Sequence, residues 1–103
     1  MIDPLSNEII FSNEGIGLAI LERGDVKDIV INDIQKTIRQ PAAIYESSRE
    51  KNTRFYFQYF KSTVFMCIVK QNEQGWYLAD TLFNPDKKII ELILQHDKLL
   101  YAK

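Results

Sequence analysis

Cysteine and histidine are the scarcest functional residues in this chain of 103 residues, with one of each. Cys67 has no second cysteine with which to form an intrachain disulfide, and no group of cysteines and histidines has the spacing of a metal site. Its neighbours Met66 and Ile68 predict that Cys67 is a buried core thiol and not a nucleophile. Structural zinc is therefore excluded, and we expect neither a metal nor a cofactor.

Short catalytic motifs are also missing. The single histidine, His96, stands between Gln95 and Asp97 in a polar segment, which is typical of a solvated surface side chain. No Ser–His–Asp set can therefore be assembled. Gly15 and Gly17 precede a predicted helix, but the third glycine of a phosphate-binding loop is absent. Any catalytic site must be sought in the arrangement of the fold.

Long hydrophobic runs are absent as well. No apolar run approaches the roughly 20 residues that cross a bilayer. The first ten residues, MIDPLSNEII, lack the basic region followed by an apolar region that marks a secretory signal. We therefore expect a cytoplasmic protein with no membrane partner.

The residues that are present are those of an ordinary globular domain, with 46% apolar and 26% charged side chains. We expect one domain spanning residues 1–103, with its core from about residue 8 to about residue 94. The charges are unevenly distributed, because residues 1–35 carry seven acidic and two basic side chains, whereas residues 36–61 carry two acidic and six basic ones. This basic middle is typical of an anion-binding surface, and equally of a solvated sheet edge.

The most informative stretch runs from Thr53 to Phe83 and contains three apolar, aromatic and β-branched runs with short polar breaks. Connections this short join strands only as hairpins, so the stretch predicts a three-stranded antiparallel meander. In its last strand, simple alternation predicts that Trp76, Leu78, Asp80 and Leu82 share a face and that Thr81 lies on the other.

Helices are expected before and after this meander in the chain, packed on one side of the sheet. Ser12 is a plausible N-cap for a helix over residues 15–23, and Asp25 for a second helix that ends before Pro41. Asn84 and Pro85 are expected to open a C-terminal helix, with residues 96–103 continuing it or fraying.

Two short runs, residues 8–11 (EIIF) and 42–46 (AAIYE), are candidate additional strands, and residues 47–52 form a predicted loop. The fold class is therefore α+β, with N-terminal helices packed on an antiparallel meander of three to five strands and a C-terminal helix.

Asp80 is an unusual residue in its apolar strand, because a buried carboxylate needs a cation or several donors. Arg54, in the first strand of the meander, is the candidate partner. Aromatic residues with interleaved basic residues can stack bases and contact phosphates, although they more often fill a core. Only Tyr45, Tyr56 and Tyr59 keep a polar tip that suits a wet site.

Residues 9–83 resemble the phage- and toxin-associated branch of the barnase–EndoU–colicin E5/D–RelE superfamily of small nucleases. The matching segments are IIFSNEGIGLAILERGDV, DIVINDIQKTIRQP, AAIYES, RFYFQYF, VFMCIVK and GWYLADTLF. The resemblance implies metal-independent RNA cleavage by attack of a 2′-hydroxyl on the adjacent phosphate. It also implies RNA as a partner, and a cognate antitoxin or immunity protein that holds the enzyme.

The resemblance assigns phosphate binding to Arg39 and Arg54, proton donation or base stacking to Tyr56, and a phosphate contact to Thr81. The resulting catalytic candidates are Arg54, Tyr56 and Thr81. The candidates for substrate binding are Arg39, Tyr45, Lys51 and Lys61. The alternative is a catalytically inactive domain of the same fold that binds a protein or a nucleic acid, and a third reading is a plain structural or interaction module.

Overall fold

The computed structural model describes residues 1–11, 27–60 and 63–103. The described elements are β1 (Ile9–Ile10), α2 (Lys27–Arg39), β2 (Ala43–Glu46), β3 (Thr53–Phe60), β4 (Thr63–Asn72), β5 (Gly75–Phe83), α3 (Lys87–His96) and β6 (Lys98–Ala102). The helix expected over residues 15–23 and the N-cap expected at Asp25 lie outside the described residues. The described elements are those of an α+β fold, as the sequence predicted.

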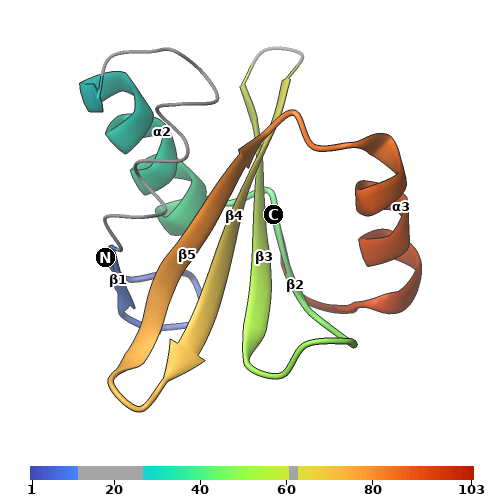
Figure 1. Cartoon of the computed structure of the whole chain (residues 1–103). Coiled ribbons are helices and arrows are strands. Elements are labelled where there is room, and N and C mark those ends of the chain that lie inside the picture. Colours follow the sequence, from blue (N-terminus) through green and yellow to red (C-terminus); the bar gives the residue numbers. More distant parts are fainter. Residues whose placement is uncertain (12–26, 61–62) are drawn as a thin grey trace.

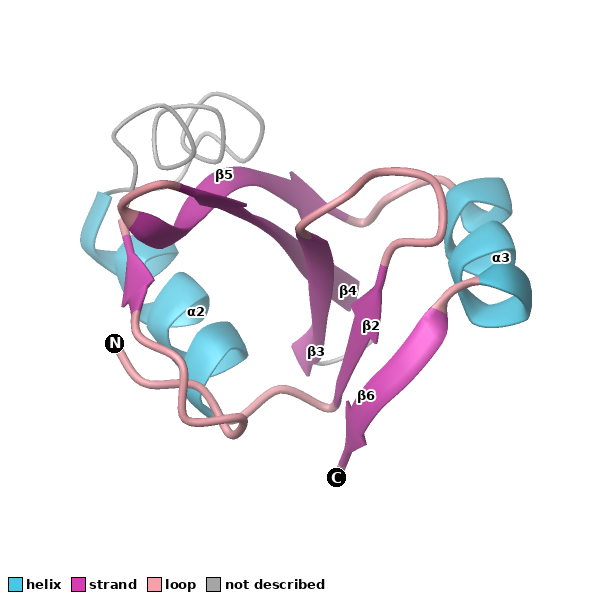
Figure 2. Cartoon of the chain, turned by 90° about the horizontal axis from the view of Figure 1, so that it is seen from below, coloured by secondary structure: helices cyan, strands magenta, loops and turns pink. Residues whose placement is uncertain are grey.

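The described strands form one six-stranded sheet in the order β1-β5-β4-β3-β2-β6. β3, β4 and β5 are the predicted antiparallel meander. The sheet is larger than the three to five antiparallel strands expected, because β6 joins one edge and β1 pairs in parallel with β5. It curves around α2, while α3 lies on the opposite side (Figures 1 and 2), so the expectation that the helices pack on one side of the sheet was wrong. We call the α2 side the concave face and the α3 side the convex face.

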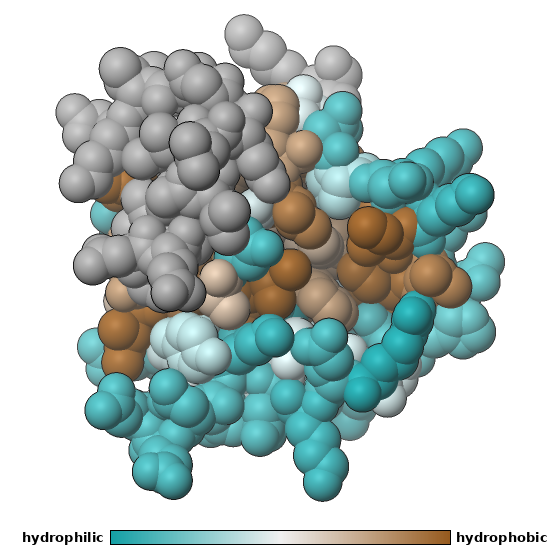
Figure 3. Space-filling model, in the orientation of Figure 1, coloured by the Kyte–Doolittle hydropathy of each residue, from teal (hydrophilic) through white to brown (hydrophobic). Residues whose placement is uncertain are grey.

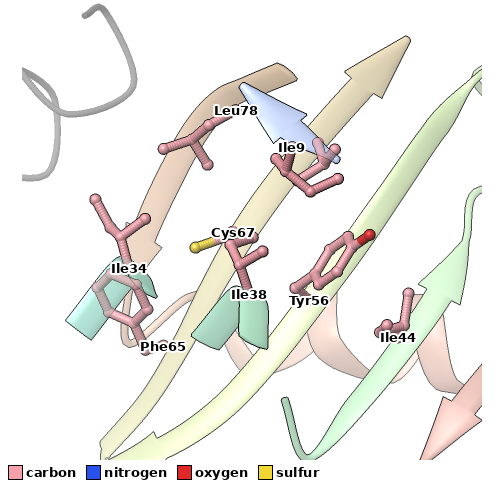
Figure 4. Packing of buried hydrophobic residues seen from close by; sticks show 9 residues of the cluster. Ile9, Ile34, Ile38, Ile44, Tyr56, Phe65, Cys67 and Leu78 are labelled. Carbon is pink, nitrogen blue, oxygen red and sulfur yellow. The ribbon is translucent and has the colours of Figure 1, made fainter. Parts of the chain in front are cut away.

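The concave face carries the larger core. Ile34 and Ile38 of α2 are fully buried there, which agrees with the predicted helix and its end before Pro41. They pack against sheet residues that alternate along the central strands, among them Tyr56, Phe65 and Cys67 (Figure 4). This period of two is what a pleated strand with one face toward α2 requires.

A second, smaller core lies on the convex face under α3. Its buried members are Phe57, Met66 and Ile93. Because β4 buries side chains on both faces, its residues 63–69 are apolar almost throughout, as expected for a central strand.

A β-bulge in β5 overturns the simple alternation expected for that strand. The pairing passes from Ile68↔Asp80 to Val69↔Leu78, which leaves Ala79 as the extra residue. Leu78 therefore lies on the concave face with Thr81, whereas Asp80 lies on the convex face. The prediction that Leu78 and Asp80 share a face was wrong, because one inserted residue reverses the faces beyond it.

A two-residue connection closes the β4–β5 hairpin. Asn72 ends β4 and Gly75 begins β5, so that Glu73 and Gln74 alone connect them. The Asn72 side-chain oxygen accepts a hydrogen bond from the backbone N–H of Gln74 at 2.8 Å. Gly75 has φ +123°, a conformation that a residue with a Cβ rarely adopts.

The C-terminal helix begins two residues later than the expected Asn84–Pro85 start. Asp86 is the N-cap, and its carboxylate accepts a hydrogen bond from the N–H of Lys88 at 2.9 Å. Asn84 instead adopts a left-handed φ of 56° and donates its N–H to the carbonyl of Val64 at 2.7 Å. It therefore belongs to the turn that leaves β5 and not to the helix.

The tail after α3 forms a strand, where a continued or frayed helix was expected. Asp97 ends the helix, and its carboxylate accepts hydrogen bonds from the N–H of Ser48 at 3.0 Å and its hydroxyl at 2.8 Å. Residues 98–102 then pair antiparallel with β2, with Tyr101 opposite Ile44. The chain end thus covers an edge that β2 would otherwise expose.

Candidate functional site

Arg54, in β3, lies on the concave face opposite Val69 of β4. One guanidinium nitrogen, Nη1, donates a hydrogen bond to the side-chain oxygen of Asn7 at 2.7 Å. The guanidinium carbon lies 4.0 Å from the ring centroid of Trp76, a cation–π contact. Its Nε is buried and has no hydrogen-bond partner within the part of the chain that the structure describes. Arg54 is therefore held in place while its buried Nε lacks a partner among the described residues.

Tyr56, two residues further along β3, is completely buried on the same face. Its hydroxyl donates a hydrogen bond to the carboxylate of Asp3. Burial raises the pKa of Tyr56 well above its ordinary value of 10.0, the Asp3 carboxylate raises it further, and nearby Arg54 lowers it. The phenol therefore remains protonated at neutral pH and can only act as a proton donor or a neutral contact.

Asp3, which the sequence analysis did not single out, connects Tyr56 to the N-terminal segment. Asp3 is 4% exposed, and its carboxylate accepts hydrogen bonds from the backbone N–H groups of Leu5 at 3.0 Å and Asn7 at 2.8 Å. Its remaining oxygen accepts the Tyr56 hydroxyl. The only local signal is the turn-rich sequence around Pro4, which gives no indication of a partner 53 residues away.

Thr81 lies in one row with Tyr56, because Cys67 of β4 pairs with both residues. All three side chains are fully buried. Burial also raises the pKa of the Cys67 thiol above its ordinary value of 9.0, and the nearby Asp80 carboxylate adds to the rise. Cys67 is thus the inert core thiol that the sequence predicted.

The predicted pairing of Arg54 with Asp80 is wrong. Arg54 lies on the concave face, whereas the β5 bulge places Asp80 on the convex face opposite Ile68. The Asp80 carboxylate accepts the backbone N–H of Thr81 at 2.7 Å, and Arg54 contacts Asn7 and Trp76 instead. The sheet itself separates the two charges.

The structure does not gather the candidates for substrate binding around Arg54. Tyr45 lies on the convex face, where its ring contacts Phe57 edge to face at 6.0 Å. Arg39 is exposed at the end of α2, and Lys51 is exposed in the loop before β3. The segment after Arg39 contacts β3 near its C-terminal end, where the Gln58 side chain donates a hydrogen bond to the carbonyl of Gln40, whereas Lys51 precedes the N-terminal end of β3. At about 3.3 Å per residue, these two ends of β3 lie on the order of 20 Å apart. Lys61 lies outside the described residues.

The convex face carries an open apolar groove beside α3, with a volume of about 280 Å³. Phe55, Ile68 and Leu82 of the sheet line one wall, and Ile89 and Leu92 of α3 line the other. The apolar surface between the sheet and α3 is visible in Figure 3. A second groove of about 160 Å³ lies near the other side of the helix, where Leu94 contributes.

Within the described ranges, no three histidine, cysteine, aspartate or glutamate residues are placed to hold a metal ion. The same residues include no helix long and apolar enough to cross a membrane. No family model, curated protein or solved structure matches the chain.

Proposed function

We propose that the protein is a metal-independent endoribonuclease of the toxin or prophage type, and that the concave face is its site. The observation that carries this proposal is the common face of Arg54, Tyr56 and Thr81, which come from two strands separated by β4. The likeness of the sequence to the small nuclease superfamily supplies the reaction. A cytoplasmic enzyme of this kind would be held by a cognate antitoxin or immunity protein.

The proposed reaction breaks the bond between phosphorus and the 5′-oxygen of RNA. The 2′-hydroxyl forms a bond to the phosphorus and loses its proton to water, and the Tyr56 phenol gives a proton to the departing 5′-oxygen. The products are a 2′,3′-cyclic phosphate and a 5′-hydroxyl, and Tyr56 regains its proton from solvent. Arg54 holds the phosphate charge, and the Thr81 hydroxyl contacts a phosphate oxygen.

Arg54→Ala tests this proposal in an assay of bulk RNA with a chelator present. We expect cleavage to fall roughly 100-fold or more, because a positioned cationic donor opposite developing charge contributes that much in known enzymes. Arg49→Ala is the matched control, since Arg49 is an exposed arginine in the loop before β3. Equal, background-level cleavage by wild type and Arg54→Ala, persisting in folded variants that expose the concave face, would reject the enzyme.

The second candidate is a non-catalytic domain that binds a protein or RNA. The complete burial of Tyr56 and Thr81 favours it, because neither side chain can touch a substrate in this conformation. The open groove beside α3 offers an alternative contact surface. Fluorescence anisotropy with labelled RNA distinguishes the two functions: binding by wild type with no cleavage under any condition supports this second candidate.

A further inference from the structure

We propose that residues 1–8 form an autoinhibitory latch that occupies the phosphate position of the concave face. This inference rests on the proposed function, because it concerns access to Arg54 and Tyr56. Two side-chain hydrogen bonds join the segment to β3: Asp3 accepts from Tyr56, and Asn7 accepts from Arg54. Both therefore end on side chains that RNA would have to reach.

The latch is a preformed turn and not a loose strand end. The N–H of Asp3 donates to the carbonyl of Asn7 at 3.0 Å, and the N–H of Ser6 donates to the carbonyl of Asp3 at 3.1 Å. Ser6 has a left-handed φ of 65°, which reverses the chain within the turn. The Asp3 carboxylate accepts two further backbone N–H groups inside the turn. Asp3 and Asn7 thus belong to one hydrogen-bonded turn that faces the sheet.

The two latch residues present the chemistry of the ligand they would exclude. A carboxylate oxygen facing a phenol and an amide oxygen facing a guanidinium occupy the donors that phosphate oxygens would use. The aliphatic residues Met1 and Leu5 add packing against the concave core, so the segment is anchored on both sides of Asp3. Tyr56, which the segment contacts through Asp3, is completely buried.

The latch fits the guanidinium less completely than a phosphate would. Asn7 takes one donor of Arg54, while the buried Nε has no hydrogen-bond partner among the described residues. A phosphate can accept two parallel hydrogen bonds from the edge of a guanidinium, including Nε. An RNA phosphate therefore has a means of competing with Asn7 once the segment lifts. The pivot would be Ile9 and Ile10, which pair with β5.

The test combines Asp3→Ala with Asn7→Ala and measures binding of a single-stranded DNA oligonucleotide. DNA lacks the 2′-hydroxyl, so binding is measured without cleavage. Trp76, the sole tryptophan, stacks on Arg54 and supplies an intrinsic fluorescence signal. We expect the double variant to bind at least 10-fold more tightly than wild type, and addition of Arg54→Ala to abolish the gain. Glu8→Ala is the control, because it removes an exposed carboxylate from the same segment.

Unchanged affinity in a folded double variant overturns the latch. If Asp3→Ala fails to fold, Asn7→Ala alone is measured, and an affinity equal to wild type again overturns it. The same measurements distinguish failure of the proposed function from failure of the latch. A gain in DNA binding without RNA cleavage by any variant retains the latch and rejects the nuclease. Full RNA cleavage by wild type, with no gain in the variants, retains the nuclease and rejects the latch.

Discussion

Tyr56 shows how one buried hydroxyl joins segments far apart in the chain. Its partner Asp3 takes three hydrogen bonds, of which the phenol supplies the one that crosses to the sheet. Tyr56→Phe removes the phenol donor and leaves a buried carboxylate oxygen of Asp3 without a hydrogen bond. We expect the free energy of unfolding at pH 7 to fall by about 1–3 kcal/mol, which denaturant titration measures. Tyr59→Phe is the control, because the Tyr59 side chain is exposed.

The raised pKa of Tyr56 predicts that the stability of the fold depends on pH. Because the pKa of Tyr56 is raised in the folded state, the unfolded chain loses this proton first as the pH rises above 10. The folded state then binds more protons, so stability falls with pH by up to about 1.4 kcal/mol per pH unit. The contribution of the protonated Tyr56 phenol to stability is fully present below pH 10. Tyr56→Phe should show a shallower loss between pH 10 and pH 11 than wild type, and identical slopes would contradict the assignment.

The residues of the candidate site were only partly predictable from the sequence. A period of two along β3 places Arg54 and Tyr56 on one face with no further information. Asp3, Asn7 and Trp76 could not be found, because their contacts with β3 depend on how a distant turn folds back onto the sheet. The predicted pairing of Arg54 with Asp80 was wrong for a related reason, because a bulge reverses the faces of the residues beyond it without leaving a sequence signal.

At the scale of elements, the hairpin between β4 and β5 is closed by backbone conformation and not by packing. A Cβ placed on Gly75 would meet no heavy atom within 4 Å, so steric contact does not exclude a side chain. Its φ of +123° nevertheless lies in a region that L-residues rarely adopt. We expect Gly75→Ala to lower the free energy of unfolding by about 1–3 kcal/mol. Gln74→Ala, an exposed neighbour in the same turn, should change it by less than about 0.5 kcal/mol.

The elements divide clearly into those that local sequence specifies and those that it does not. The meander and α2 follow from apolar periodicity and from the helix-stopping Pro41. β6 does not, because residues 98–102 form a strand only by pairing with β2 and after Asp97 has been tied to Ser48. The parallel pairing of β1 with β5 is likewise a tertiary contact that a two-residue strand cannot signal alone.

At the scale of the whole molecule, one sheet carries two hydrophobic cores, and the concave core is more completely enclosed than the convex core. Ile38 of α2 is fully enclosed on the concave face. Ile93 is the one buried residue of α3, and an open groove lies on each side of that helix. The concave core should therefore resist local opening more than the convex core, because it exposes less apolar surface to water.

Ile93→Ala tests this division. We expect it to lower the free energy of unfolding by about 2–3 kcal/mol, the lower part of the range for such truncations, because the helix beside open grooves can settle into the space. Ile38→Ala should lower the free energy of unfolding by more, because the residues around Ile38 on the concave face enclose it completely. Leu94→Ala, at a side chain that is 55% exposed, is the control within α3.

Amide hydrogen exchange locates the effect. Exchange in Ile93→Ala should accelerate in α3 and β6, which follow one another and are joined at Asp97, while β4 and α2 keep their protection. Acceleration spread evenly over both faces would show that the two cores open as one unit. In that case movement at α3 would also reach Arg54 and Tyr56, and the concave site could not be regulated independently of the convex groove.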